Sequence, residues 1–178
     1  LHKIMPRSTV WLALNSQGKK VIEEIGKLTV NLNWLKIQAL EPKYPQGYDE
    51  ILVPTILKQR FPYGYSAANI GTVILNLQAV LQAYEAVVEG KPLIERIIAL
   101  CGPALKEPLH IKVRIGTALQ DVVGPRVKDT SACRFVLNGL LTGWELKDLS
   151  LPVDKTYSQI IALPENRERK FLAFARPG

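Results

Sequence analysis

The residues NIGTVILNLQAVLQAYEAVVEG, from Asn69 to Gly90, decide how the rest of the chain is organised. Apolar side chains recur in this stretch at i, i+3, i+4 and i+7, the spacing of a helix with one wide apolar face. They are Ile70, Val73, Ile74, Leu77, Val80, Leu81, Tyr84, Val87 and Val88. Gly90 and Pro92 predict the end of the helix, because glycine accepts a left-handed cap and proline cannot continue a helix. We expect the apolar face to pack on a core and the opposite face, with Gln78 and Gln82, to meet solvent.

The start of this helix has two candidate caps, Asn69 and Asn76. Either side chain has an oxygen that can accept a hydrogen bond from the unpaired N–H groups of a first turn. If Asn76 is the cap, residues 70–75 are extended and the helix begins beside a turn. The choice bears on function, because the N-terminus of a helix attracts anions.

Upstream of this stretch the sequence predicts a strand, a helix and a second strand, over residues 8–14, 17–28 and 32–40. This order is typical of an α/β layer. A turn rich in proline and glycine follows, from Glu41 to Gly47, and a helix is expected over residues 49–60. Asp49 and Glu50 suit its first turn, where carboxylates favour the helix dipole, and Pro54 should kink or shorten it.

Downstream of Gly90 the pattern changes to short strands. A hairpin is expected from strands over residues 93–100 and 110–115, followed by a short helix with Thr117 and Gln120 at capping-box spacing. Gly124-Pro125 should end that helix, and two further strands are expected over residues 133–137 and 157–163. This is the element order of a β-grasp module, and we place the domain boundary between Gly90 and Pro92.

Composition excludes several classes of function. The formal net charge of the 178 residues is +7, but the basic residues are scattered, and the densest group, Arg167, Arg169 and Lys170, is interrupted by glutamate. We therefore expect a solvated surface and no nucleic-acid partner. No run of apolar residues is long enough to cross a membrane. The chain starts at Leu1 without a secretory leader, so we expect a piece of a longer, non-secreted chain.

No catalytic or metal-binding group stands out from the residues alone. Cys101 and Cys133 form no CxxC pair and fit buried thiols in a reducing compartment. His2 and His110 have no partner at ligand spacing, and no phosphate-binding or nucleophile motif is present. Asp49 and Glu50 are adjacent, so on a helix they point about 100° apart and do not form an acid/base pair. We assign no catalytic residue and no metal.

Three segments resemble the RnfC subunit of the Rnf electron-transport complex. They are KYPQGYDEIL (residues 43–52), VEGKPLIERIIALCGPALKEP (residues 88–108) and VRIGTALQDVV (residues 113–123). The resemblance extends to the NqrA subunit of the sodium-pumping quinone reductase and to the flavin-carrying, NADH-oxidising subunit of complex I. It covers nearly the whole chain, and the final RKFLAFARPG is similar to NqrA-like tails.

The resemblance implies an α/β fold in two parts. Residues 1–90 correspond to the C-terminal part of a flavin/NADH-type α/β domain, and residues 91–178 to a soluble-ligand-binding β-grasp (SLBB) domain with an extension. The implied cofactor-binding residues are Gln46, Gly47, Asp49 and Asn76, and the resemblance predicts that Gly47, Asp49 and Asn76 line one pocket. In the family a carboxylate at the position of Asp49 lies near the nicotinamide, and an asparagine at the position of Asn76 contacts the flavin, which favours the later helix start.

The implied function is that of an electron-transfer oxidoreductase subunit, passing electrons between NADH or flavin and a partner protein or quinone. FMN and NADH are expected in the full-length protein and no cofactor in this chain alone, because the glycine-rich flavin loop of relatives lies upstream. The implied partners are other subunits of a redox complex and a small-molecule ligand at the SLBB domain. The implied location is the cytoplasm, peripheral to the inner membrane. The alternative is a non-catalytic β-grasp module that binds a ligand or a partner.

Overall fold

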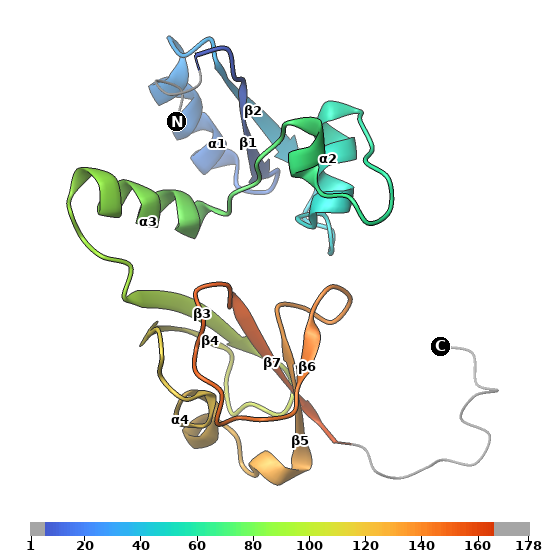
Figure 1. The fold of residues 1–178 in the computed structure, drawn as a ribbon, viewed down its shortest axis with the longest axis vertical. Helices are drawn as coiled ribbons and strands as arrows, with labels where there is room; N and C mark the ends of the chain where they lie inside the picture. The colour runs from blue at the N-terminus through green and yellow to red at the C-terminus, as the bar shows by residue number, and fades with distance from the viewer. Residues whose placement is uncertain (1–5, 166–178) are drawn as a thin grey trace, which may run out of the picture. The chain divides into compact units, whose positions relative to one another are not determined.

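The computed structural model describes residues 6–165 of the chain. The chain divides into two compact units, Leu1–Ile74 and Leu75–Gly178, whose elements are labelled in Figure 1. The helix that was expected to close the first domain therefore belongs to the second unit. The assignment of residues 1–90 and 91–178 to two family domains stays a prediction. The RKFLAFARPG tail and the basic group at residues 167–170 lie outside the described residues.

The first unit contains a parallel strand pair joined by a helix, as the sequence predicted. Strand β1 (Val10–Asn15) pairs with β2 (Leu35–Leu40), in register from Val10 opposite Leu35 to Asn15 opposite Leu40. Helix α1 (Lys19–Thr29) makes the crossover that parallel strands require and lies against β2. The second strand begins three residues later than the predicted Leu32, because residues 29–35 turn through two backbone hydrogen bonds. This arrangement confirms the α/β character of the chain.

The remainder of the first unit is helix α2 (Asp49–Leu57) and a short 3₁₀ turn, η1 (Ala67–Ile70). Helix α2 tolerates Pro54 but ends at Leu57, three residues before the predicted Arg60, and its cap residue Lys58 has a left-handed φ of 57°. The apolar side chains that are fully buried among the described residues of this unit are Val53 and Ala67.

The long helix of the sequence analysis is α3 (Leu77–Val88), and Asn76 is its cap. The Asn76 Oδ1 accepts a hydrogen bond from the Ala79 N–H at 2.7 Å. The alternative start at Asn69 is wrong, because Asn69 and Ser66 form a capping box around η1 instead. Glu89 ends the helix and Gly90 has the predicted left-handed conformation, with φ 67°.

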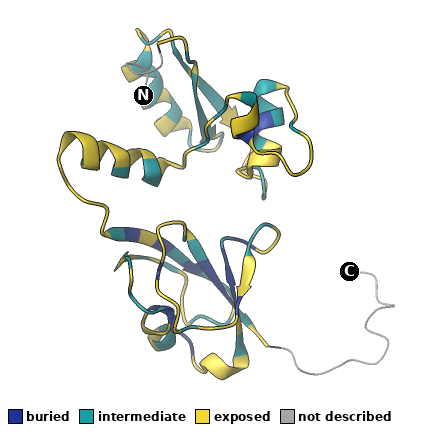
Figure 2. Ribbon diagram, in the orientation of Figure 1, coloured by how far each residue is buried: buried dark blue, intermediate teal, exposed yellow. Residues whose placement is uncertain are grey.

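The expected packing of α3 is wrong. None of its residues is buried, and Leu77 and Val87 on the apolar stripe are 79% and 85% exposed. Figure 2 shows α3 without the dark blue of buried residues. The face that touches the rest of the unit is the one that carries Gln78 and Gln82, which hydrogen-bond to the backbone of a strand. Helical periodicity separated the two faces correctly but did not identify which of them makes the contact.

The second unit is built on a five-stranded mixed sheet with the order β4-β3-β7-β5-β6. Strand β3 pairs antiparallel with β4 and parallel with β7, and β5 pairs antiparallel with β7 and β6. The bounds are β3 (Glu95–Cys101), β4 (Leu109–Arg114), β5 (Cys133–Leu137), β6 (Trp144–Leu146) and β7 (Gln159–Pro164). The hairpin and both later strands were predicted from the sequence, whereas β6 was not.

One short helix, α4 (Leu119–Val123), covers the sheet of this unit and is followed by 3₁₀ turns η2 (Gly124–Arg126) and η3 (Thr130–Ala132). The predicted capping box at its start is wrong: Ala118 is the cap residue, without a side-chain hydrogen bond. Instead the Thr117 carbonyl accepts from the Val153 N–H, and the Gln120 N–H donates to the Leu149 carbonyl. The pairing with residues 149–153 therefore positions the helix. It ends at Gly124, as predicted.

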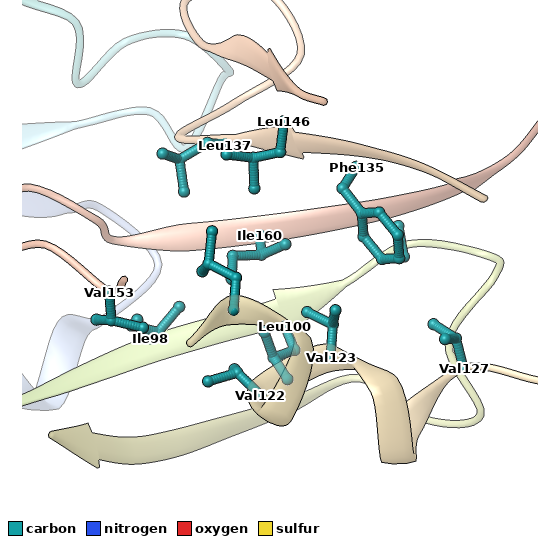
Figure 3. Packing of buried hydrophobic residues seen from close by; sticks show 12 residues of the cluster. Ile98, Leu100, Val122, Val123, Val127, Phe135, Leu137, Leu146, Val153 and Ile160 are labelled. Atoms are coloured by element: carbon teal, nitrogen blue, oxygen red, sulfur yellow. The ribbon is translucent and has the colours of Figure 1, made fainter. Parts of the chain in front are cut away.

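The main hydrophobic core of the described chain lies between α4 and this sheet. Figure 3 shows side chains from α4, β3, β5 and β7 meeting there. Ile98, Leu137 and Leu119 have no exposed surface, and Leu100 and Ile160 are each 1% exposed. Alternate residues of a strand point to the same face, so the strand sequences place these side chains together. The second unit consequently has its own folding core.

The two cysteines are free thiols. Cys101 and Cys133 lie on β3 and β5, and each is half-buried. Loss of solvation raises the pKa of both thiols, and the Asp129 charge adds to the rise at Cys133. Both thiols are therefore protonated at neutral pH and are weak nucleophiles. Among residues 6–165, no helix combines the length and apolar character that a membrane crossing requires.

Candidate functional site

The predicted cofactor residues Gln46, Gly47 and Asp49 lie in one turn and the helix start that follows it. The Gln46 N–H donates to the Lys43 carbonyl, and the Tyr48 N–H to the Pro45 carbonyl, which folds the turn. The Gln46 amide Nε2 donates to Thr55 Oγ1 at 3.2 Å, so this side chain ties the turn to the second half of α2. Gln46 therefore holds the turn in place.

Gly47 has room around it. A Cβ added to this residue would meet no other atom within 4 Å, and its φ is not in the left-handed region. The backbone of the chain therefore does not require glycine here. A small residue in an open turn lets another molecule approach the backbone closely, which is the role that the family resemblance implies.

Asp49 is an exposed carboxylate at the start of α2. Partial loss of solvation raises its pKa above the ordinary value, and the negative charge of Glu50 adds to this rise. The Glu50 charge also raises the pKa of the Tyr48 hydroxyl. Within the described residues Asp49 has neither an ion pair nor a side-chain hydrogen bond. A carboxylate in this state can accept hydrogen bonds from hydroxyl groups of a ligand.

Asn76, the fourth predicted residue, lies at the start of α3 in the second unit. Its Oδ1 is used by the helix cap, while its Nδ2 makes no hydrogen bond within the described residues. This amide group remains able to donate to a ligand. Asp49 lies in the first unit and Asn76 in the second, so their predicted meeting in one pocket stays a prediction.

The structure places a further site in the second unit that the sequence analysis missed. A groove of about 400 Å³ lies beside α3, and we call it the Arg96 groove. Its lining residues are Ala79, Gln82, Ala83, Ala86, Leu93, Arg96, Lys155 and Thr156. The sequence contains one signal of it: Arg96 is in phase with Ile98 and Leu100 on β3, so a charged residue occupies a core-facing position.

Arg96 is buried, with 5% of its surface exposed. Its Nε donates to the Tyr157 carbonyl, the one hydrogen bond that the guanidinium makes with described residues. Loss of solvation lowers the pKa of Arg96, and the nearby Asp154 charge opposes this. Asp154 does not form an ion pair with Arg96; its Oδ1 accepts at 2.8 Å from both the N–H and the hydroxyl of Thr156. Several guanidinium N–H groups therefore remain for another partner.

Two glutamines fix the α3 wall of the groove. Gln78 makes two hydrogen bonds with Ile97, accepting from its N–H at 2.7 Å and donating to its carbonyl at 3.1 Å. The Gln82 Nε2 donates to the Glu95 carbonyl at 3.2 Å. Strand β7 pairs with β3 only from Ala99 onward, so these side-chain amides satisfy backbone groups that have no neighbouring strand.

Residues 6–165 contain no group of three or more histidine, cysteine, aspartate or glutamate side chains placed to hold a metal ion. The candidate ligand-binding groups described above are the Asp49 carboxylate, the Asn76 amide and the Arg96 guanidinium. These groups lie at the start of α2 and in the neighbourhood of α3.

Comparison with known proteins finds C subunits of ion-translocating redox complexes among the relatives of this chain. No model of a known protein family matches the chain. It is 29% identical, over 93% of its length, to the C subunit of the proton-translocating ferredoxin:NAD(+) oxidoreductase complex of Clostridium ljungdahlii, covering 36% of that protein. It is 34% identical, over 64% of its length, to the C subunit of the Na(+)-translocating ferredoxin:NAD(+) oxidoreductase complex of Acetobacterium woodii, covering 26%.

A third relative is the C subunit of the ion-translocating oxidoreductase complex of Pseudomonas aeruginosa, 31% identical over 71% of this chain and 16% of that protein. The chain thus spans between 16% and 36% of the length of these three relatives. All three relatives are C subunits of ion-translocating redox complexes. Within that class the chain is RnfC-like: it is homologous to part of the RnfC subunit, which confirms the resemblance drawn from its motifs.

Proposed function

We propose that this chain is part of an electron-transfer subunit that passes electrons between NADH or flavin and a partner protein or quinone. The observation that carries the proposal is the alignment of 93% of the chain with the C subunit of a ferredoxin:NAD(+) oxidoreductase complex. Other subunits of such a complex are the proposed partners. The proposed location is cytoplasmic, peripheral to the inner membrane.

In this proposal the first unit is part of a flavin/NADH-type α/β domain and the second is an SLBB-type β-grasp domain. The parallel strands and crossover helix of the first unit support its assignment. The sheet order of the second unit supports the other: a hairpin, a short helix and further strands, with β3 between β4 and the parallel β7. FMN and NADH would be held in the full-length protein, of which this chain supplies part of the site.

The residues present fit these cofactors at two positions. Asp49 has a carboxylate without a cation, which suits ribose hydroxyls or a carboxamide. Asn76 has an unused amide N–H₂ group, which suits the acceptor atoms of a flavin ring. Gly47 would allow close approach of the backbone, and Gln46 would hold the turn through Thr55. Bound NADH and flavin would supply hydride transfer, and the residues of this chain would position the rings.

An FMN titration of the complete subunit tests the Asn76 role. Asn76→Ser keeps a capping oxygen but removes the amide, so it separates ligand binding from helix capping. We expect the Asn76→Ser variant to bind FMN with about tenfold lower affinity, as followed by quenching of flavin fluorescence, because one hydrogen bond is lost. Asn33→Ser, in the exposed turn before β2, is the matched control and should bind like the wild type. Equal affinity of the Asn76 and Asn33 variants would remove Asn76 from the site.

A second function, ligand binding by the second unit without electron transfer, is favoured by a specific observation. The Arg96 groove contains a buried guanidinium with unused N–H groups in a unit that has its own core. Ligand binding in this groove does not require electrons to pass through the first unit.

A further inference from the structure

We propose that the Arg96 groove binds a small organic monoanion, a carboxylate attached to a short apolar chain. The proposal names the ligand class for the β-grasp module proposed above, and it rests on that second unit alone. It does not depend on flavin, NADH or the first unit, so its failure and the failure of the electron-transfer proposal can be told apart.

The anionic end of the ligand follows from Arg96. A guanidinium carries five N–H donors, and burial of its charge is costly unless these donors are satisfied. One of them is used by the Tyr157 carbonyl. Asp154 forms no ion pair with Arg96, and its Oδ1 accepts from Thr156 instead. A carboxylate can accept two parallel hydrogen bonds from a guanidinium, which makes it the natural partner in this groove.

The expected charge of the ligand follows from the neighbouring side chains. Lys155 lines the groove with Arg96, and Asp154 is close enough to act on the Arg96 charge. Two positive charges and one negative charge leave a surplus of one positive charge. A monoanion neutralises this surplus, whereas a phosphate dianion would exceed it. We therefore expect a carboxylate to bind better than inorganic phosphate.

The apolar part of the ligand follows from the α3 wall. Ala79, Ala83 and Ala86 are small side chains at helical spacing, and Leu93 adds apolar surface on the approach to β3. The groove volume of about 400 Å³ is within the range of small-molecule sites, roughly 300–1,000 Å³. Because Gln78 and Gln82 bind the helix to β3, this wall is held beside the charged end.

The direct experiment compares octanoate with octanol, which share an apolar chain and differ in charge. Each is titrated into the purified chain and followed through the backbone amide shifts of α3 and of residues 154–157. We expect saturable binding of octanoate with a Kd of roughly 1 mM, the strength typical of ligands with so few atoms. Octanol and inorganic phosphate should each bind at least about tenfold more weakly, because each lacks one of the two contacts.

Variants locate the binding. Lys155→Gln should weaken octanoate several-fold, and Lys147→Gln, an exposed lysine outside the groove, is the matched control that should not. Ala83→Glu changes an exposed helix position and adds a carboxylate to the lining of the groove, where it would repel the anion and compete for Arg96, so it should abolish binding. Arg96→Gln should also abolish it, and the other two variants decide the matter if this one does not fold. Absent octanoate binding, equal binding of octanol, or unchanged binding in both Lys155→Gln and Ala83→Glu would overturn the proposal.

Discussion

Asp49 is the residue whose ionisation the fold opposes most plainly at the candidate cofactor site. Its pKa is raised above 3.8, the ordinary value for aspartate, by loss of solvation and then by Glu50. Since the folded pKa is the higher one, the contribution of Asp49 to stability is complete below the unfolded pKa. It is lost as pH rises through the folded pKa.

The pH dependence of Asp49 is therefore a prediction. Its carboxyl ¹³C shift should titrate with a midpoint above 3.8, and Glu50→Gln should move the midpoint down without returning it to 3.8, because the solvation cause remains. Asp49→Asn should remove the fall in stability of the first unit over the same pH window, measured by hydrogen exchange in α2. A midpoint at or below 3.8 would contradict this description of the site.

At the residue scale the sequence predicted caps and turns well where one side chain acts locally. Asn76, Gly90 and the Asp49 helix start all have the predicted roles. Thr117 and Gln120 do not, because backbone pairing with residues 149–153 positions α4 and leaves no need for a side-chain cap. Arg96 was missed because its environment is set by Tyr157, which accepts its hydrogen bond, and by the charge of Asp154. Both residues lie about sixty residues further along the chain.

Helix α3 and strand β3 depend on each other through Gln78. Replacement of Gln78 by alanine removes both hydrogen bonds to Ile97 and leaves backbone groups that only water can satisfy. We expect a loss of about 1–2 kcal/mol in local stability, seen as at least about fivefold faster hydrogen exchange of the Ile97 amide.

The matched control for this prediction is Gln120→Ala, on α4 in the same unit. The Gln120 side chain is exposed and makes no hydrogen bond among those described; its backbone N–H and carbonyl, which the substitution keeps, pair with Leu149 and Gly124. Exchange at Ile97 should stay at the wild-type rate in this variant. If Gln78→Ala behaves like the control, the hydrogen bonds between Gln78 and Ile97 do not hold α3 on β3.

At the element scale most helices and strands were predictable, because their periodicity is a local property. Helix α3 shows the limit of this approach: its two faces were assigned correctly, but its contact with β3 is polar. Hydrophobicity alone predicts that the apolar face of a helix is the buried one. Here the contact is made by glutamine amides, because they can hydrogen-bond to backbone N–H and C=O groups of a strand that has no neighbouring strand. Strand β6 has three residues, too few for an alternating pattern to indicate.

At the scale of the whole molecule, the sequence indicated the family and the α/β character, and the comparisons confirmed the RnfC-like relationship. The division into units was not readable from the sequence, because α3 is apolar like a core helix but belongs to the second unit. The meeting of Asp49 and Asn76 in one pocket depends on how two separate units come together, which no local pattern encodes.

The most direct test of the electron-transfer account is steady-state oxidation of NADH by the complete flavin-loaded subunit, comparing Asp49→Asn with the wild type. The account predicts that the wild type bleaches its flavin absorbance with NADH and that Asp49→Asn raises the KM for NADH about tenfold, because a charged hydrogen-bond acceptor is lost. Asp121→Asn, an exposed aspartate on α4, should leave the KM unchanged. A wild-type subunit that NADH does not reduce, or an Asp49→Asn variant with the KM of the Asp121 control, would contradict it.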